Sequence, residues 1–109
     1  MNEPRLIRKY ANRRLYDTVR SRYVNLSDVR NLIADGVRVR VVEQSTSRDI
    51  TNSILLQIIG SMERDDGAIL TTGFLTDLIR TAGRGSDPGL PERLQTALRS
   101  ALPPPPLHQ

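Results

Sequence analysis

The sequence has no cysteine among its 109 residues, which excludes disulfides, thiolate metal sites and thiol catalysis. Its one histidine, His108, lies in the C-terminal tail, and no glycine-rich phosphate loop or nucleophile motif occurs. The pair Asp65 and Asp66 fits a solvated helix end better than a metal site. We therefore expect a protein that is not an enzyme and uses neither a cofactor nor a metal.

Aromatic residues and long apolar runs are also scarce. The chain has three tyrosines and one phenylalanine, and its hydrophobic content is only 38%. Such a composition builds a modest core, which makes self-association a reasonable expectation. The longest apolar run, residues 54–59, contains Gln57 and is far too short to span a membrane. The N-terminus carries no apolar segment of a signal peptide, so we expect a cytoplasmic protein without membrane association.

Positive charge, in contrast, is concentrated at the N-terminus. The net charge is +4, yet residues 1–22 hold seven cations and two acids, a balance of +5, so the rest of the chain sums to −1. The cations are Arg5, Arg8, Lys9, Arg13, Arg14, Arg20 and Arg22. This asymmetry favours a polyanion partner. The alternative is a solvated basic arm.

Arginine suits nucleic acid because its guanidinium donates paired hydrogen bonds to phosphates or guanine edges. Tyr10 and Tyr16 stand between these cations, where they would bind phosphates, stack on bases or pack in the core. No helix-turn-helix, zinc finger or leucine zipper is visible, so the groove and the binding mode stay open. Single-stranded RNA stays open as well, since basic residues with tyrosines suit single strands.

The first third of the chain predicts strands followed by a helix. Residues 5–10 favour a strand, and a turn follows in which Asn12 tolerates left-handed geometry. Residues 13–18 and 21–26 predict two further strands joined by a short connection. Ser27 is the expected N-cap of a short helix that bears Val29, Leu32 and Ile33 on one stripe and stops at Gly36.

Residues 37–44 alternate as a strand, and residues 48–51 predict a short partner strand in a second hairpin. Thr51 or Asn52 is the expected cap of a helix over residues 53–65. Its wide apolar face consists of Ile54, Leu55, Ile58, Ile59 and Met62. We therefore predict an α+β domain of small antiparallel strands, or hairpins, with two helices.

A short helical appendage is expected after a boundary near Asp66. Residues 67–102 predict two amphipathic helices, and residues 103–109 form a proline-rich tail. Their apolar faces are too small for a separate core, so we expect them to pack on the first domain, pair with another subunit or bind an apolar ligand. The residues of these faces are Phe74, Leu75, Leu78, Ile79, Leu94 and Leu98.

The stretch "LIRKYANRRLYDTVRSRYVNLSDVRNLIADG", followed by "VVEQSTSRDITNSILLQII", resembles the N-terminal domain of bacterial polyhydroxyalkanoate synthesis repressors. The family pattern K-Y-x-N-R-R-L-Y-D-T is met by Lys9, Tyr10 and residues 12–18, and later matches follow at Ser21, Tyr23 and residues 49–51. The segment after residue 70 looks like a diverged form of the family's C-terminal segment.

This resemblance implies a DNA-binding transcriptional repressor of genes for granule-associated proteins and polymer metabolism. It also implies that polymer or nascent granules release the repressor from double-stranded DNA. We expect a homo-oligomer, most simply a dimer on a palindromic operator. A granule-surface scaffold is the alternative. The predicted nucleic-acid contacts are Arg5, Arg8, Lys9, Tyr10, Asn12, Arg13, Arg14, Tyr16, Arg20 and Arg22, with Arg13 and Arg14 first among them.

Overall fold

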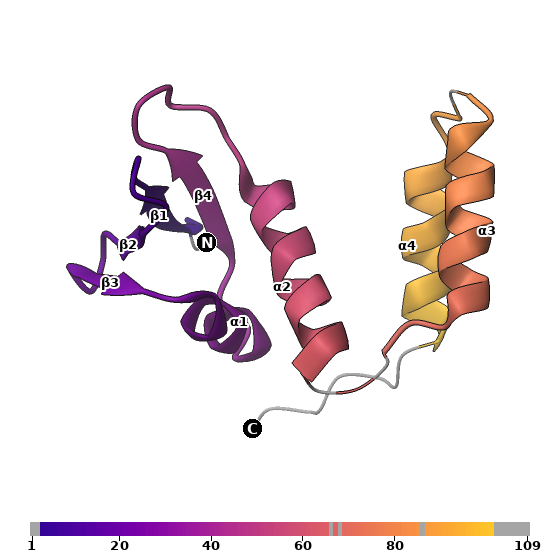
Figure 1. Ribbon diagram of the computed structural model, residues 1–109, viewed down its shortest axis with the longest axis horizontal. Coiled ribbons are helices and arrows are strands. Elements are labelled where there is room, and N and C mark those ends of the chain that lie inside the picture. The colour runs from indigo at the N-terminus through magenta and orange to yellow at the C-terminus, as the bar shows by residue number, and fades with distance from the viewer. Residues whose placement is uncertain (1–2, 66, 68, 86, 102–109) are drawn as a thin grey trace. The chain divides into compact units, whose positions relative to one another are not determined.

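The computed structural model describes residues 3–65, 67, 69–85 and 87–101 of the chain. Its elements, in chain order, are β1 (Arg5–Lys9), β2 (Leu15–Asp17), β3 (Arg22–Val24), α1 (Leu26–Ala34), β4 (Val39–Glu43), α2 (Thr51–Asp65), α3 (Thr72–Gly83) and α4 (Leu90–Ala101) (Figure 1).

The chain divides into two compact units, Met1–Ile69 and Leu70–Gln109. The first contains all the strands with α1 and α2, and the second contains α3 and α4. The predicted α+β class with a helical C-terminal appendage is therefore confirmed. The boundary residue Asp66 and the tail, residues 103–109, lie outside the described residues. None of the described helices is long and apolar enough to cross a membrane.

The first unit is built on a four-stranded sheet of order β3-β2-β1-β4. The strands β1, β2 and β3 pair antiparallel, as a hairpin sequence predicts, with Ile7 opposite Asp17. The pairing of β1 with β4 is parallel, with Ile7 opposite Val41, so the sheet is mixed. A parallel neighbour needs a crossover, and the segment that contains α1 supplies it.

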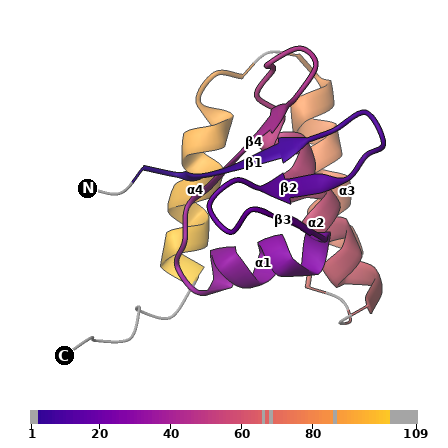
Figure 2. The ribbon, with the colours of Figure 1, turned by 90° about the vertical axis from the view of Figure 1, so that its left-hand side faces the viewer.

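Both helices of this unit cover one face of the sheet, and the other face is open. Side chains alternate along a strand, so Ile7, Leu15 and Val41 all point toward α1 and α2. The buried cluster is Ile7, Leu15, Val29, Leu32, Val41, Ile54 and Ile58. Figure 2 views the open face, with α2 behind the strands. The hydrophobic core thus anchors the sheet from one side and leaves its other side available.

The helix α1 begins at a different residue from the one predicted. Asn25, not Ser27, is the N-cap: its side chain accepts a hydrogen bond of 2.8 Å from the backbone N–H of Asp28. The Asp28 carboxylate in turn accepts one of 2.9 Å from the N–H of Asn25. This reciprocal capping box satisfies two N–H groups at once, which a cap at Ser27 would not do. It also moves Leu26 from the predicted strand into the helix.

The predicted second hairpin is reduced to one bridge, between Val42 and Asp49. The helix α2 begins earlier than expected, at Thr51 itself, whose N–H donates to Asp49 Oδ1 over 2.9 Å. The Thr51 hydroxyl oxygen also accepts from the Val41 N–H over 2.9 Å. Two backbone bonds flank the bridge, from Glu43 N–H to the Arg48 carbonyl and from Ile50 N–H to the Val41 carbonyl, and the helix then begins at once, so the partner segment is too short to form a full strand.

The second unit is an antiparallel pair of helices without a closed core (Figure 1). Thr71 caps α3, accepting from the N–H of Phe74 over 3.0 Å. No residue of α3 or α4 is buried: Leu78 and Leu94 are half-buried, and Phe74, Leu75, Ile79 and Leu98 are exposed. The predicted apolar faces therefore exist, and most of their side chains are exposed to solvent in the single chain.

Candidate nucleic-acid interface

The turn between β1 and β2 carries the densest group of predicted contacts. The Tyr10 N–H donates to the Arg14 carbonyl over 2.9 Å, and the Arg13 N–H donates to the Tyr10 carbonyl over 2.8 Å. These bonds define a three-residue hairpin loop whose last residue takes the left-handed conformation. That residue is Arg13, with φ 67°, and not Asn12 as expected. Asn12 instead accepts the N–H of Arg14 on its side-chain oxygen, at 3.1 Å.

Arg13 is held in a conformation that ordinary residues avoid. A side chain with a Cβ costs about 1–2 kcal/mol there, and glycine is the usual occupant. The Arg13 side chain is exposed and makes no hydrogen bond or ion pair with any residue that the structure describes. The fold itself therefore gains nothing visible from an arginine at this position.

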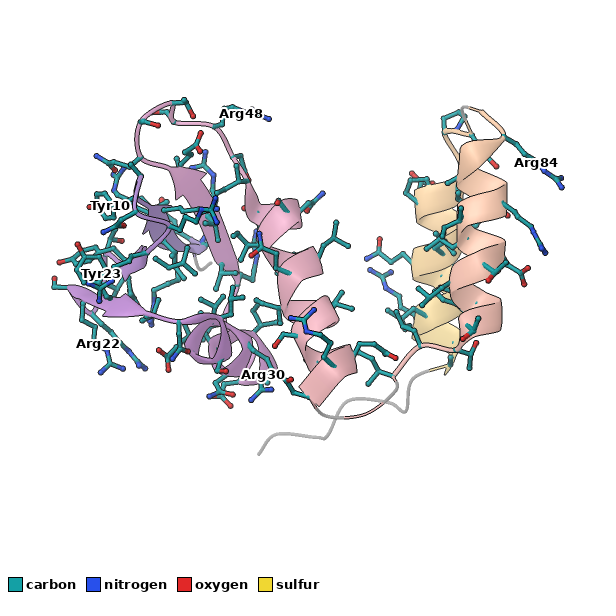
Figure 3. The ribbon with its side chains drawn as sticks, viewed as in Figure 1. Tyr10, Arg22, Tyr23, Arg30, Arg48 and Arg84 are labelled. Atoms are coloured by element: carbon teal, nitrogen blue, oxygen red, sulfur yellow. The ribbon has the colours of Figure 1, made fainter. Side chains whose placement is uncertain are left out.

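A cluster of three tyrosines lies on the open face of the sheet. Tyr16 and Tyr23 are cross-strand partners in β2 and β3, with ring centroids 5.3 Å apart, edge to face. Tyr10 completes the cluster, at 6.1 Å from Tyr16 and 6.3 Å from Tyr23 (Figure 3). The guanidinium carbon of Arg14 lies 3.9 Å from the centroid of the Tyr23 ring. The tyrosines therefore belong to the open face and take no part in the helix-side core.

Arg8 extends this face along β1. It stands opposite Tyr16 on one side and Val42 on the other, and its Nη1 donates to Gln44 Oε1 over 3.2 Å. Arg40 of β4 shares the face because its register partner is Leu6. Its guanidinium pairs with Asp49 over 3.2 Å, and both side chains remain about half exposed.

Lys9 points to the helix side of the sheet, with Ile7 and Leu15. It lines an open hollow beneath the hairpin turn, which Arg13, Arg14 and Gln57 also line. Asp28 lies on the same hollow, so its charge opposes those of the three cations. The hollow adjoins the turn and places Lys9 beside Arg13 and Arg14. Tyr23, on the edge strand β3, also lines it, so the hollow meets the tyrosine cluster at this edge of the sheet.

Arg5 has a structural partner. Its Nη1 donates to Asp17 Oδ2 over 3.1 Å, and its side chain is only 19% exposed, whereas Asp17 is fully buried. Burial raises the pKa of the Asp17 carboxyl, but hydrogen bonds from the N–H groups of Arg20 and Val19 and from Arg5 together outweigh burial and hold that pKa below its usual value. Asp17 therefore stays ionised and fixes both Arg5 and the loop after β2.

Arg20 and Arg22 lie at the other end of β2 from the hairpin turn. Both are exposed, and neither side chain has a hydrogen bond or ion pair with the described part of the chain. Figure 3 shows Arg22 projecting outward. The Thr18 hydroxyl, directly after β2, donates to the Leu6 carbonyl over 2.8 Å and ties β1 to the loop that carries Arg20. The motif residues Asp17 and Thr18 thus build the scaffold that carries the basic residues.

The structure brings Arg8, Tyr10, Arg14 and Tyr16 together, with Asn12 and Arg13 at the adjoining turn. Two members of this surface were not predicted as contacts, Tyr23 and Arg40. Tyr23 was recoverable from the alternation of its strand opposite Tyr16. Arg40 depends on the parallel pairing of β4 with β1, which no local pattern encodes. The apolar residues of α3 and α4 belong to the other unit.

The described residues include no group of three histidine, cysteine or acidic side chains that would hold a metal ion. The chemistry of this surface is that of arginine and tyrosine hydrogen-bond donors on a rigid sheet. Such donors recognise phosphates and base edges.

Comparison with known proteins agrees with this chemistry. Residues 6–66 match the family described as "PHB/PHA accumulation regulator DNA-binding domain", a description of a regulator and not of an enzyme. A protein of Thiocystis violacea named "Uncharacterized protein in phbA 5'region" is 47% identical over 83 residues, covering 76% of this chain and 60% of its own length.

An uncharacterized protein of Allochromatium vinosum is 46% identical over 83 residues, 76% of this chain and 54% of its own. The chain thus spans between half and two thirds of the length of these relatives. No solved structure matches. The family match covers more than half of the chain and includes all four strands, apart from the first residue of β1, together with α1 and α2. We conclude that the chain belongs to the PHB/PHA accumulation regulators through their DNA-binding domain.

Proposed function

We propose that this chain is a transcriptional repressor that binds double-stranded DNA through the β1–β2 turn and the open sheet face, and that it controls genes of polyhydroxyalkanoate synthesis and granule-associated proteins. The observation that carries the proposal is the placement of Arg14 on the tyrosine cluster beside Arg8 and Arg13. These cations project from a sheet whose opposite face is occupied by the core, so DNA can approach without disturbing the fold.

The electrostatics of the unit support a polyanion partner. Removing Arg5 from the candidate contacts, because Asp17 neutralises it, leaves Arg8, Lys9, Arg13, Arg14, Arg20 and Arg22. Lys9 and Arg22 point to the helix side of the sheet, so we assign Lys9, beneath the turn, and Arg20 and Arg22, at the far end of β2, to phosphates that flank the bases under the open face. Phosphate contacts of this kind position a protein on DNA, while contacts to base edges give sequence preference.

The strained backbone of Arg13 gives a second argument. Backbone strain that nothing in the fold requires is typical of functional positions. Glycine would relieve the strain at once, yet the turn carries a cation at its exposed tip. A contact from the Arg13 side chain to DNA explains why arginine occupies this position.

Single-stranded RNA fits this surface less well. Stacking on bases needs an aromatic ring with a free face. Here the rings pack edge to face against one another, and Tyr10 and Tyr16 are half-buried. The Arg14 guanidinium covers one face of the Tyr23 ring. The tyrosines are thus arranged to support arginines, and we favour duplex DNA over a single strand.

The second unit suits assembly and release. A helical pair of this size without buried residues needs further burial to be stable. We propose that its exposed apolar residues join subunits into an oligomer, and that polymer or a related apolar ligand acts on the same face to release the DNA. The residues concerned are Phe74, Leu75, Leu78, Ile79, Leu94 and Leu98.

Binding is best tested on a duplex selected from genomic fragments by the full-length chain. Replacing Arg13 and Arg14 together by alanine should abolish binding to this duplex and leave the thermal unfolding transition cooperative. The matched control replaces Arg80 and Arg84, two arginines of the second unit, and changes the net charge equally. If both double variants bind like the wild type, the DNA-binding surface lies elsewhere.

Deleting residues 70–109 tests the role of the second unit. The remaining chain keeps every buried core residue, so it should fold and bind DNA as a monomer. Polymer granules added to the full-length complex should release DNA, and the shortened chain should no longer respond. Release from both proteins would place the response in the first unit.

A further inference from the structure

Arg14 is restrained at both its backbone and its side chain. Its N–H donates to Asn12 Oδ1 over 3.1 Å, and its carbonyl accepts from Tyr10 over 2.9 Å. Its guanidinium lies 3.9 Å from the Tyr23 centroid. An arginine held in this way loses less conformational freedom when it binds a partner than a free surface arginine does.

The support beneath Arg14 is itself fixed. Tyr23 packs edge to face against Tyr16 and Tyr10, at 5.3 and 6.3 Å. The contact with Tyr23 uses the π-face attraction of a cation and leaves the guanidinium N–H groups without an acceptor among the described residues. Two parallel N–H donors on a planar group match the O6 and N7 acceptors of guanine in the major groove.

We propose that Arg14 is a specificity-determining residue that reads a guanine through O6 and N7, and that Tyr23 is a positioning residue that holds Arg14 without touching DNA. This inference rests on the proposed function. β1 and β2 are the two inner strands of the sheet, so the part of this hairpin that reaches a base edge in the major groove is its turn, residues 10–14, which carries Arg14. Arg13, exposed next to it at the tip, then lies where it meets a phosphate.

The test is selection of duplexes from a random library by the full-length chain and by its Arg14→Ala and Arg13→Ala variants. The wild type should select sites with one nearly invariant guanine in each half-site. Arg14→Ala should lose preference at that base pair alone and bind the wild-type site about 10- to 100-fold more weakly. Arg13→Ala should weaken binding to all duplexes by one common factor and keep the consensus.

Replacing the selected guanine by 7-deazaguanine, which removes the N7 acceptor, gives a direct check. It should lower wild-type affinity by about tenfold and leave the affinity of Arg14→Ala unchanged. If Arg14→Ala keeps the full consensus and only binds more weakly throughout, Arg14 holds a phosphate and the guanine assignment is wrong. If both single variants bind every duplex like the wild type, the proposed function itself fails.

The positioning role of Tyr23 is tested with one conservative and one disruptive variant, each made in the wild-type chain and in the Arg14→Ala chain. Tyr23→Phe keeps the ring and should preserve affinity and consensus, whereas Tyr23→Ser should weaken site binding about 2- to 5-fold. In the Arg14→Ala background, Tyr23→Ser should have no further effect, and thermal melting confirms that each variant is folded. An equal loss in both backgrounds would show that Tyr23 contacts DNA independently, which contradicts the positioning role.

Discussion

Replacing Arg13 by glycine should change folding and binding in opposite directions. Its φ of 67° costs a residue with a Cβ about 1–2 kcal/mol, and glycine removes that cost. Glycine also adds conformational freedom to the unfolded chain, worth about 0.5–1 kcal/mol against folding. The net gain is about 0–1.5 kcal/mol, and its central value of about 0.75 kcal/mol raises the melting temperature by roughly 3–6 °C for a unit of this size.

The same substitution removes a cation from the hairpin tip. A lost hydrogen bond to a charged phosphate weakens binding by at least about tenfold at fixed salt. Circular dichroism melts measure the first effect, and fluorescence anisotropy with a labelled duplex measures the second. A protein that becomes more stable and binds less well cannot have lost binding through misfolding.

Two controls isolate the contributions. Ser47 also has a positive φ, 60°, in the turn between β4 and α2, so Ser47→Gly should stabilise the protein and leave DNA binding unchanged. Arg13→Ala keeps the strained Cβ and should lose binding without gaining stability. The reasoning fails if Arg13→Gly lowers the melting temperature, or if it binds DNA as tightly as the wild type.

The remaining predictions concern the scaffold. Asp17→Asn should cost about 3 kcal/mol in urea unfolding, because it leaves Arg5 without its buried partner, whereas Arg40→Gln, at an exposed pair, should cost less than about 1 kcal/mol. Because the pKa of Asp17 is lowered in the fold, its contribution should be complete above about pH 3.8 and be lost as the pH falls further; Asp17→Asn should flatten that acid limb, and an unchanged limb would contradict this assignment. Asn25→Ala should destabilise α1 by about 1 kcal/mol, and Ser27→Ala should have little effect; the reverse order would restore Ser27 as the cap.

Local patterns sufficed for the elements whose determinants lie within a few residues. The strand-forming residues around Tyr16 and Tyr23 predicted both strands, which are shorter than the predicted ranges 13–18 and 21–26. The spacing of Val29, Leu32, Ile54 and Ile58 predicted the helix faces that form the core. The spacing of apolar residues along each helix was enough for this prediction, because the apolar face of a helix packs toward the core.

Tertiary pairing was beyond such patterns. The parallel alignment of β4 with β1 joins residues more than 30 positions apart, and it alone brings Arg40 onto the basic face. The cap of α1 was expected at Ser27, and the reciprocal bond with Asp28 places it two residues earlier, at Asn25. A left-handed arginine at position 13 contradicts residue preference, which is why Asn12 was expected there.

Arg5 illustrates the limit of charge counting. In the sequence it is one of seven equivalent N-terminal cations, and only the fold shows that Asp17 neutralises it in a half-buried pair. The number of cations available to DNA is therefore smaller than the sequence suggests. Their division between bases and phosphates determines how binding responds to salt.

The most direct test of DNA binding by this surface is the salt dependence of affinity for the selected duplex. Five phosphate contacts per subunit, which we assign to Arg8, Lys9, Arg13, Arg20 and Arg22, predict that log affinity falls with log salt at a slope of about −4.5. Arg13→Ala should reduce that slope by about 0.9. A slope near zero for the wild-type chain would contradict the account.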